Sequence, residues 1–220
     1  YAGDIAVSPK SPRTVAVTRL SAGVVPATQG GMVVFDDTVP RPVTAPKIDI
    51  MAGSNRNHSQ VAWSLDGSKL YSTDTLLSLY VSTVDGAGIH PERDFNAAFP
   101  SPGHLHVDPL SGLVLHDSGR LVDPATGLPR GAYRMTGNNG SQWVSVDELP
   151  GPVWVATSSL ASSGPNFRID AFDRSRFTAT ATYPLAIEIG LPFDFVRWGS
   201  KGFAYRSLNG IGLVQLSASP

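Results

Sequence analysis

The chain has 220 residues, a net charge of −1 at pH 7 and 16% charged residues, which is enough length for one all-β domain with a sizeable core. Its basic residues are scattered, which argues against nucleic acid as the main partner because phosphate binding needs clustered lysine and arginine. The lack of cysteine excludes disulfides, thiolate–zinc sites and a cysteine nucleophile. No run of about 20 apolar residues occurs, so the sequence predicts no membrane-spanning helix.

Short segments rich in β-branched, aromatic and leucine residues alternate with glycine and proline along the whole chain, as is typical of β-strands and turns. The first unit predicts strands at 4–8, 14–20 and 32–36, followed by a proline-broken edge to residue 46. The same order returns in four further units. Their predicted strands lie at 60–64, 69–73 and 79–83; at 104–107, 113–116 and 120–123; at 143–146, 152–156, 167–172 and 177–184; and at 193–198, 203–206 and 212–216.

These repeats predict an all-β fold, a β-propeller of about five four-stranded blade units that forms part of a larger propeller. A single domain would cover 1–220, and the final unit ends after its third strand. In such a fold the first strand of each unit lines a central channel. A β-sandwich is the alternative, although sandwiches rarely repeat their turn chemistry so regularly. The units lie at approximately 3–50, 58–98, 103–136, 141–186 and 192–217.

Three segments resemble a group of exported bacterial propellers related to the YVTN type: YAGDIAVSPKSPRTVAV, GRLVDPATGLPRGAY and FDFVRWGSKGFAYRS. The family is largely uncharacterised and of a seven-bladed type, and its last blade carries a motif similar to residues 197–204. The resemblance implies that this chain is the C-terminal part, about five blades, of a secreted, periplasmic or cell-surface protein. We expect any export signal to lie upstream, because YAGDIAVSP predicts a strand and not a signal peptide. The resemblance carries over no catalytic residue.

The aspartates of DPATG (Asp123) and LDGS (Asp66) predict turns and not metal ligands, because a carboxylate there accepts backbone N–H groups. In DPATG, Gly127 would supply a positive φ. The tryptophans at the ends of predicted inner strands are expected to pack between neighbouring units and not to stack on ligands. They are Trp63, Trp143 and Trp198.

His104 and His106 lie two residues apart and therefore share one face of a predicted strand. With Asp108 or Asp117 they could form a nitrogen and oxygen metal site. Because no third ligand lies at a spacing that forces convergence, we favour partly exposed imidazoles at the rim of a blade. The sequence predicts no cofactor.

Motifs for nucleophilic catalysis or phosphate binding are missing from the sequence, since it has no G-x-S-x-G element and the GNNG at 137–140 lacks a following lysine. The acidic pair Asp147 and Glu148 falls in a predicted turn, where adjacent side chains face opposite ways. Two loops are instead rich in amide and cationic side chains, which suit sugar hydroxyls and peptide backbones, although such residues are also common in ordinary turns. The candidate binding residues are Asn55, Arg56, Asn57, His58, Asn138, Asn139 and Gln142.

The sequence therefore favours a non-catalytic exported propeller that acts as a scaffold and binds a protein or glycan partner through this loop face. One alternative is an enzyme with a metal or cofactor in the channel, held by residues such as His104 or Asp108. Such an enzyme would be a lactonase-like hydrolase or a relative of quinoprotein dehydrogenases. Another alternative is a structural subunit of a larger cell-surface assembly, in which open sheet edges pair with another chain.

Overall fold

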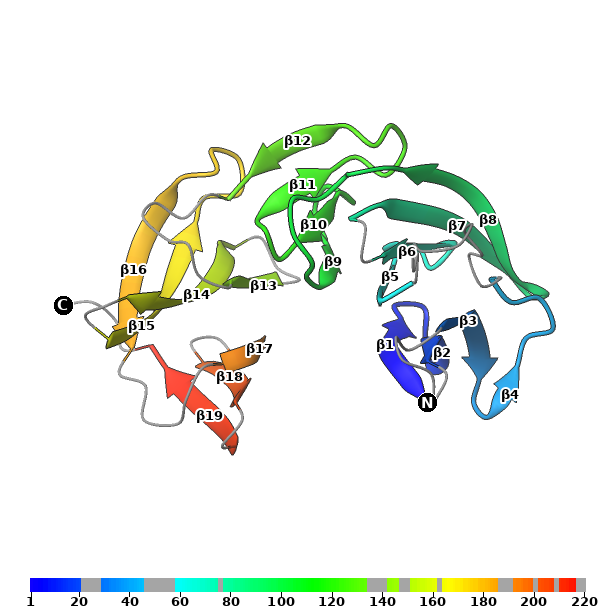
Figure 1. The fold of residues 1–220 in the computed structure, drawn as a ribbon, viewed down its shortest axis with the longest axis horizontal. Coiled ribbons are helices and arrows are strands. Elements are labelled where there is room, and N and C mark those ends of the chain that lie inside the picture. The colour runs from blue at the N-terminus through cyan, green and yellow to red at the C-terminus, as the bar shows by residue number, and fades with distance from the viewer. Residues whose placement is uncertain are drawn as a thin grey trace.

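The computed structural model describes residues 1–20, 29–45, 58–74, 77–133, 142–146, 151–161, 164–185, 192–199, 202–207 and 210–216. In these residues the chain forms 19 strands in five antiparallel sheets, which follow one another around a common axis (Figure 1). The predicted all-β propeller architecture is confirmed. No helix long and apolar enough to cross a membrane occurs in this part of the chain.

Each sheet, here called blade 1 to blade 5 in chain order, runs outward from an inner strand, and its strands pair in sequence order. Blades 1 to 4 have four strands and blade 5 has three in the described residues, in agreement with the predicted three-strand final unit. The strands are β1 (Ala2–Ser8), β2 (Ser11–Leu20), β3 (Gln29–Asp36), β4 (Val39–Pro40), β5 (Gln60–Trp63), β6 (Lys69–Thr73), β7 (Leu79–Asp85), β8 (Gly88–Phe95), β9 (Leu105–Val107), β10 (Val114–His116), β11 (Arg120–Val122), β12 (Pro129–Ala132), β13 (Gln142–Val146), β14 (Val153–Ala161), β15 (Gly164–Phe172), β16 (Ala179–Leu185), β17 (Pro192–Trp198), β18 (Gly202–Ser207) and β19 (Gly210–Gln215).

Four apolar clusters fill the interfaces between consecutive blades. Because side chains alternate across a strand, neighbouring residues enter different clusters. On β14, Val155 packs toward blade 3, whereas Trp154 and Ala156 pack toward blade 5. On β5, Ala62 faces blade 3 and Trp63 faces blade 1. Blades 2, 3 and 4 therefore each bury apolar side chains on both of their faces.

The blades form an open arc (Figure 1). The inner strands pack in sequence, β1 on β5, β5 on β9, β9 on β13 and β13 on β17. Among the described elements, β17 and β1 show no comparable packing, so blades 1 and 5 each have one face without a neighbouring blade.

The predicted turn at Asp123 is confirmed. The Asp123 carboxylate accepts the N–H of Ala125 at 2.8 Å, and the N–H of Gly127 donates to the Asp123 carbonyl at 2.8 Å. Gly127 has the positive φ, 71°, that the turn requires. The exposed Asp66 caps its turn as predicted, and hydrogen bonds from Ser64 and Ser68 lower its pKa to about 2.

Of the tryptophans predicted to pack between blades, Trp63 does so and Trp198 does not. Trp63 is buried between blades 1 and 2 and donates its indole N–H to the Ala6 carbonyl at 2.9 Å, as expected of a packing residue. Trp198, however, is 59% exposed, because no blade packs on that face of blade 5. The side chain of Trp143 lies outside the described residues.

Two glycines with the same backbone conformation differ in their surroundings, and this difference allows a matched test of blade packing. Gly112 has φ 70° and open space around it, whereas a Cβ on Gly127 would lie 2.3 Å from the Phe95 ring of blade 2. We expect Gly112→Ala to cost about 1–2 kcal/mol from backbone strain alone. Gly127→Ala should cost about 1–3 kcal/mol more, because it overpacks the blade 2–blade 3 interface. Urea unfolding of both variants measures this difference, and equal losses would contradict the close approach of these blades.

Candidate functional site

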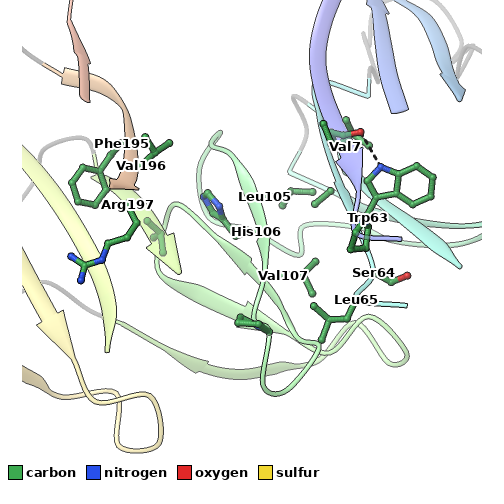
Figure 2. Close-up of a pocket in the computed structure, with 16 residues that line it drawn as sticks. Val7, Trp63, Ser64, Leu65, Leu105, His106, Val107, Phe195, Val196 and Arg197 are labelled. Carbon is green, nitrogen blue, oxygen red and sulfur yellow. Dashed lines mark hydrogen bonds between the residues drawn. The ribbon is translucent and has the colours of Figure 1, made fainter. Parts of the chain in front are cut away.

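A cavity of about 640 Å³ lies on the axis side of the blades and is lined by residues of the inner strands. Figure 2 shows lining residues of β1, β5, β9 and β17 around this space, with the side chains of Trp63, Phe195 and Arg197 pointing away from it. Most of the lining is apolar, including Val7, Leu65, Val107 and Val196, and His106 is one of the few polar side chains. We call this cavity the channel hollow.

The channel hollow lies toward the C-terminal ends of the inner strands. Three of its lining residues follow an inner strand by one or two residues: Pro9 after β1, Leu65 in the turn after β5, and Pro109 after β9. The loops expected from the sequence to bind a partner instead precede β5 and β13. The hollow therefore lies away from the N-terminal ends of β5 and β13.

Most of the predicted loop-face residues fall outside the described residues, namely Asn55, Arg56, Asn57, Asn138 and Asn139. Gln142 is placed as the first residue of β13, but its side chain is outside them too. These residues remain predictions.

The structure corrects the expected position of His58, which is only 5% exposed. Its Nδ1 lies 2.6 Å from the Ser72 hydroxyl, and its ring meets the edge of Tyr80. The N–H of Ser59 already pairs with the Thr73 carbonyl, which draws His58 into the sheet. Burial lowers the pKa of His58 to about 4, so the ring is neutral at pH 7 and belongs to the interior of blade 2.

His104 and His106 share a face, as predicted, and both reach one buried carboxylate. His104 Nδ1 lies 2.8 Å from Asp117 Oδ2, and His106 Nε2 lies 3.3 Å from Asp117 Oδ1. Asp117 also accepts the backbone N–H of His104 at 2.8 Å and that of Val144, on the inner strand of blade 4, at 3.0 Å. This carboxylate therefore ties blade 3 to blade 4.

Two opposing effects act on the pKa of Asp117. Burial by itself would raise it, but the hydrogen bonds from His104 and His106 outweigh burial and hold the pKa well below the usual range of an aspartate. The carboxylate is therefore ionised at neutral pH. Each imidazole that donates to it is fixed in tautomer and orientation.

Asp108, the other candidate ligand, has a different role. It accepts the N–H of Ser111 at 3.0 Å and forms an ion pair with Arg174 of blade 4. These bonds commit its carboxylate to a turn and a blade interface, so it does not join the two histidines. Within the residues that the structure places, no group of three or more His, Cys, Asp or Glu side chains is arranged to hold a metal ion.

Two carboxylates that sequence reasoning did not single out have comparable structural roles. Asp4 on β1 accepts the N–H of Val61 on β5 at 2.8 Å and so joins blades 1 and 2. Burial raises the pKa of Asp4, although its backbone hydrogen bonds and the nearby His104 and His106 oppose this effect. Asp74 is buried in blade 2 and accepts the Tyr80 hydroxyl at 2.8 Å. Asp74 and Asp117 each follow the second strand of their blade directly, a repeat that the sequence contained.

Substitution of Asp117 tests its role between the blades. Asp117→Asn keeps the shape but removes the charge that four N–H donors share, so we expect a loss of about 2–4 kcal/mol at pH 7. Asp37→Asn, at an exposed ion pair with Arg13, should cost less than about 1 kcal/mol.

The pH dependence gives a second readout of Asp117. A carboxyl whose folded pKa lies below its unfolded value of 3.8 stabilises the protein above that pH, and this contribution is lost as the pH falls through the folded pKa. Urea unfolding between pH 7 and pH 2 should therefore show a smaller acid-induced loss in Asp117→Asn than in the unsubstituted protein. Parallel pH profiles would contradict the role of this carboxylate.

Comparison with known proteins gives information on the fold of this chain and not on its function. No family model and no curated protein sequence matches the chain. Among solved structures, the beta-propeller domain of Cps50 (Swd1) from Myceliophteria thermophila matches with a TM-score of 0.66 and 13% identity, over 97% of this chain and 70% of that one. Chaetomium thermophilum Sqt1, solved bound to the N-terminus of the ribosomal protein L10, matches with a TM-score of 0.62 and 15% identity, over 97% of this chain and 60% of that one.

Hydrazine synthase from Kuenenia stuttgartiensis also matches, with a TM-score of 0.68 and 13% identity over 93% of this chain. This chain covers 55% of the length of the matched hydrazine synthase chain. The matches include an enzyme and a peptide-bound protein, and a shared fold at such low identity does not decide between such functions. What they establish is that these five sheets have the architecture of a β-propeller.

Proposed function

We propose that this chain is a non-catalytic propeller module that binds a protein partner by accepting an apolar peptide segment in the channel hollow. The observation that carries this proposal is the hollow itself, about 640 Å³ in volume and lined mainly by aliphatic side chains of the inner strands. A concave apolar surface with few polar groups on a rigid scaffold is typical of binding sites. Its position on the axis of a propeller matches the places where such folds bind ligands.

The polar residues near the channel support binding and not catalysis. Asp117 is engaged by two imidazoles and a backbone N–H of the next blade, and Asp108 pairs with Arg174. His116 is fully buried against Phe99, with ring centroids 4.4 Å apart. These groups stabilise sheets and blade interfaces.

The lining also favours a peptide over a glycan. Sugar recognition commonly uses exposed aromatic faces, but Trp63 and Phe195 turn their rings into blade interfaces. Aliphatic side chains such as Leu65 and Val107 line the hollow together with the polar His106. The solved structure of Sqt1 with the N-terminus of a ribosomal protein is an example of the same fold holding a protein segment. A glycan or a cell-surface assembly remains the second kind of partner for the loop face predicted from the sequence.

Export is part of this proposal and is supported only by the resemblance of three sequence segments to exported bacterial propellers. We propose a secreted, periplasmic or cell-surface location. Immunoblotting of fractionated source cells tests it, and recovery of the protein in the cytoplasmic fraction alone would overturn it.

Selection from a random peptide library displayed on phage tests the binding function without a known partner. We expect enrichment of peptides with apolar residues. Binding of a selected peptide should weaken about tenfold or more in Leu65→Asp, because a charge would then face apolar groups in the hollow. Biolayer interferometry gives the affinities.

The matched control for this experiment is Leu128→Asp. Leu128 is 60% exposed, in a turn of blade 3 away from the hollow. We expect this variant to bind the peptide as the unsubstituted protein does. A library without enriched peptides, or equal affinities for the Leu65 and Leu128 variants, would reject peptide binding in the hollow.

A further inference from the structure

The channel hollow has an apolar end and a polar end. The apolar end is formed by the turns that follow the inner strands, with Pro9, Leu65 and Pro109. The polar end lies earlier along the same strands, where the lining includes His106 of β9. Figure 2 shows His106 between lining residues of β1 and β5 on one side and those of β17 on the other. A ligand in the hollow therefore meets both an apolar wall and an imidazole.

The hydrogen bond to Asp117 decides what His106 can offer to a ligand. The Asp117 carboxylate is ionised at neutral pH, so it can only accept hydrogen bonds. The Nε2 of His106, 3.3 Å from Asp117 Oδ1, therefore carries the ring proton. The other nitrogen of a neutral imidazole, Nδ1, then has a lone pair, and nothing in the described part of the chain donates to it. His106 is therefore a hydrogen-bond acceptor toward a ligand.

The charged groups close to His106 are carboxylates. Asp117 contacts it directly. Asp4 of β1 is near enough for an electrostatic effect, because burial raises the pKa of Asp4 and the two histidines, His104 and His106, oppose this rise. The Asp4 carboxylate also accepts two backbone N–H groups, at 2.8 and 2.9 Å, which stabilise its ionised form. A group bound at His106 is therefore close to two negative charges.

Nearby cationic side chains do not offset these charges. Among the described residues that line the hollow, only Arg197 is permanently positive. Its guanidinium stacks on the rings of Trp154 and Phe203, 4.8 and 4.6 Å from their centroids, and Figure 2 shows it directed away from the hollow. Burial lowers the pKa of His116 to about 4, so this ring is neutral. The polar end thus favours a positively charged hydrogen-bond donor.

We propose that the peptide in the channel hollow is held with its amino terminus at the polar end, where the terminal ammonium donates a hydrogen bond to Nδ1 of His106 beside Asp4 and Asp117. This inference rests on the proposed peptide binding and specifies the ligand. An ammonium satisfies the acceptor and both negative charges, whereas a carboxylate would be repelled. A chain terminus fits better than an internal lysine, because its charge lies directly next to the first side chains, which then reach the apolar end.

Isothermal titration calorimetry at pH 7, where amino termini are mostly protonated, tests this proposal. The probe is the tripeptide amide of leucine, which is compared with its N-acetylated form. Acetylation removes the positive charge and leaves the apolar side chains unchanged. We expect the acetylated probe to bind this chain about tenfold or more weakly. This comparison needs no variant of the protein.

Substitution of His106 locates the recognition. His106→Leu removes the acceptor and keeps the wall apolar, so the two probes should bind this variant with similar affinities. The matched control is His90→Leu. His90 lies on the outer strand β8 and pairs with the exposed Asp85 at 3.1 Å. This control should prefer the free amine as strongly as the unsubstituted protein does.

The outcomes separate this inference from peptide binding itself. Equal affinities of the two probes for the unsubstituted protein, with binding still lost in Leu65→Asp, would reject amino-terminal recognition and leave peptide binding in the hollow intact. If neither probe binds and the peptide library yields no enrichment, both proposals fail. A preference for the free amine that persists in His106→Leu would overturn the assignment to His106. An acetylated probe that binds tightly once lysine replaces its first leucine would overturn the choice of a chain terminus.

Discussion

Burial of apolar sheet faces against the neighbouring blade is the constraint on which the rest of this structure depends. A single four-stranded sheet whose alternate residues are apolar on both sides cannot be stable in water by itself. Here each sheet is covered by the next, and the four clusters between blades make up the core. Stability is therefore distributed along the arc, as in other repeat proteins, where each unit contacts its neighbours.

Polar groups fix how one blade sits on the next. Asp4 and Asp117 each accept a backbone N–H from the inner strand of the following blade, that of Val61 and that of Val144. The indole of Trp63 donates in the opposite direction, to a carbonyl of blade 1. Apolar packing is not directional, whereas these bonds hold only at one relative position of the blades. They therefore set the geometry of the inner strands and, with it, the shape of the channel hollow.

The hollow follows from this arrangement. The inner strands surround the axis, and their side chains leave the space between them unfilled. Val107 and Leu65 remain partly exposed there, while Leu105, on the same strand as Val107, enters the cluster between blades 2 and 3. One imidazole of the pair held by Asp117, that of His106, lies at the edge of this space with a fixed orientation.

Much of the fold could be predicted from the sequence, because strand periodicity and turn chemistry are local. The alternation of apolar residues, the aspartate turn ending at Gly127 and the three-strand final unit all depend on neighbours within a few residues. The blade architecture followed from the repetition of these local signals. The pairing of His104 with His106 on one face was predictable for the same reason.

The site and its connections were decided by tertiary structure. His58 has the sequence context of a polar loop, yet pairing of the adjacent strand with β6 places it in the interior of blade 2. Trp198 resembles Trp63 in sequence position, but it is exposed because no blade lies beyond it. Asp108 is nearer to the histidines in sequence than Asp117, and only the folded blades show that Asp108 binds Arg174 whereas Asp117 binds both imidazoles. The sequence by itself determined which residues form strands and turns, whereas contacts between blades, made by residues far apart in the chain, decided what each exposed or buried side chain can do.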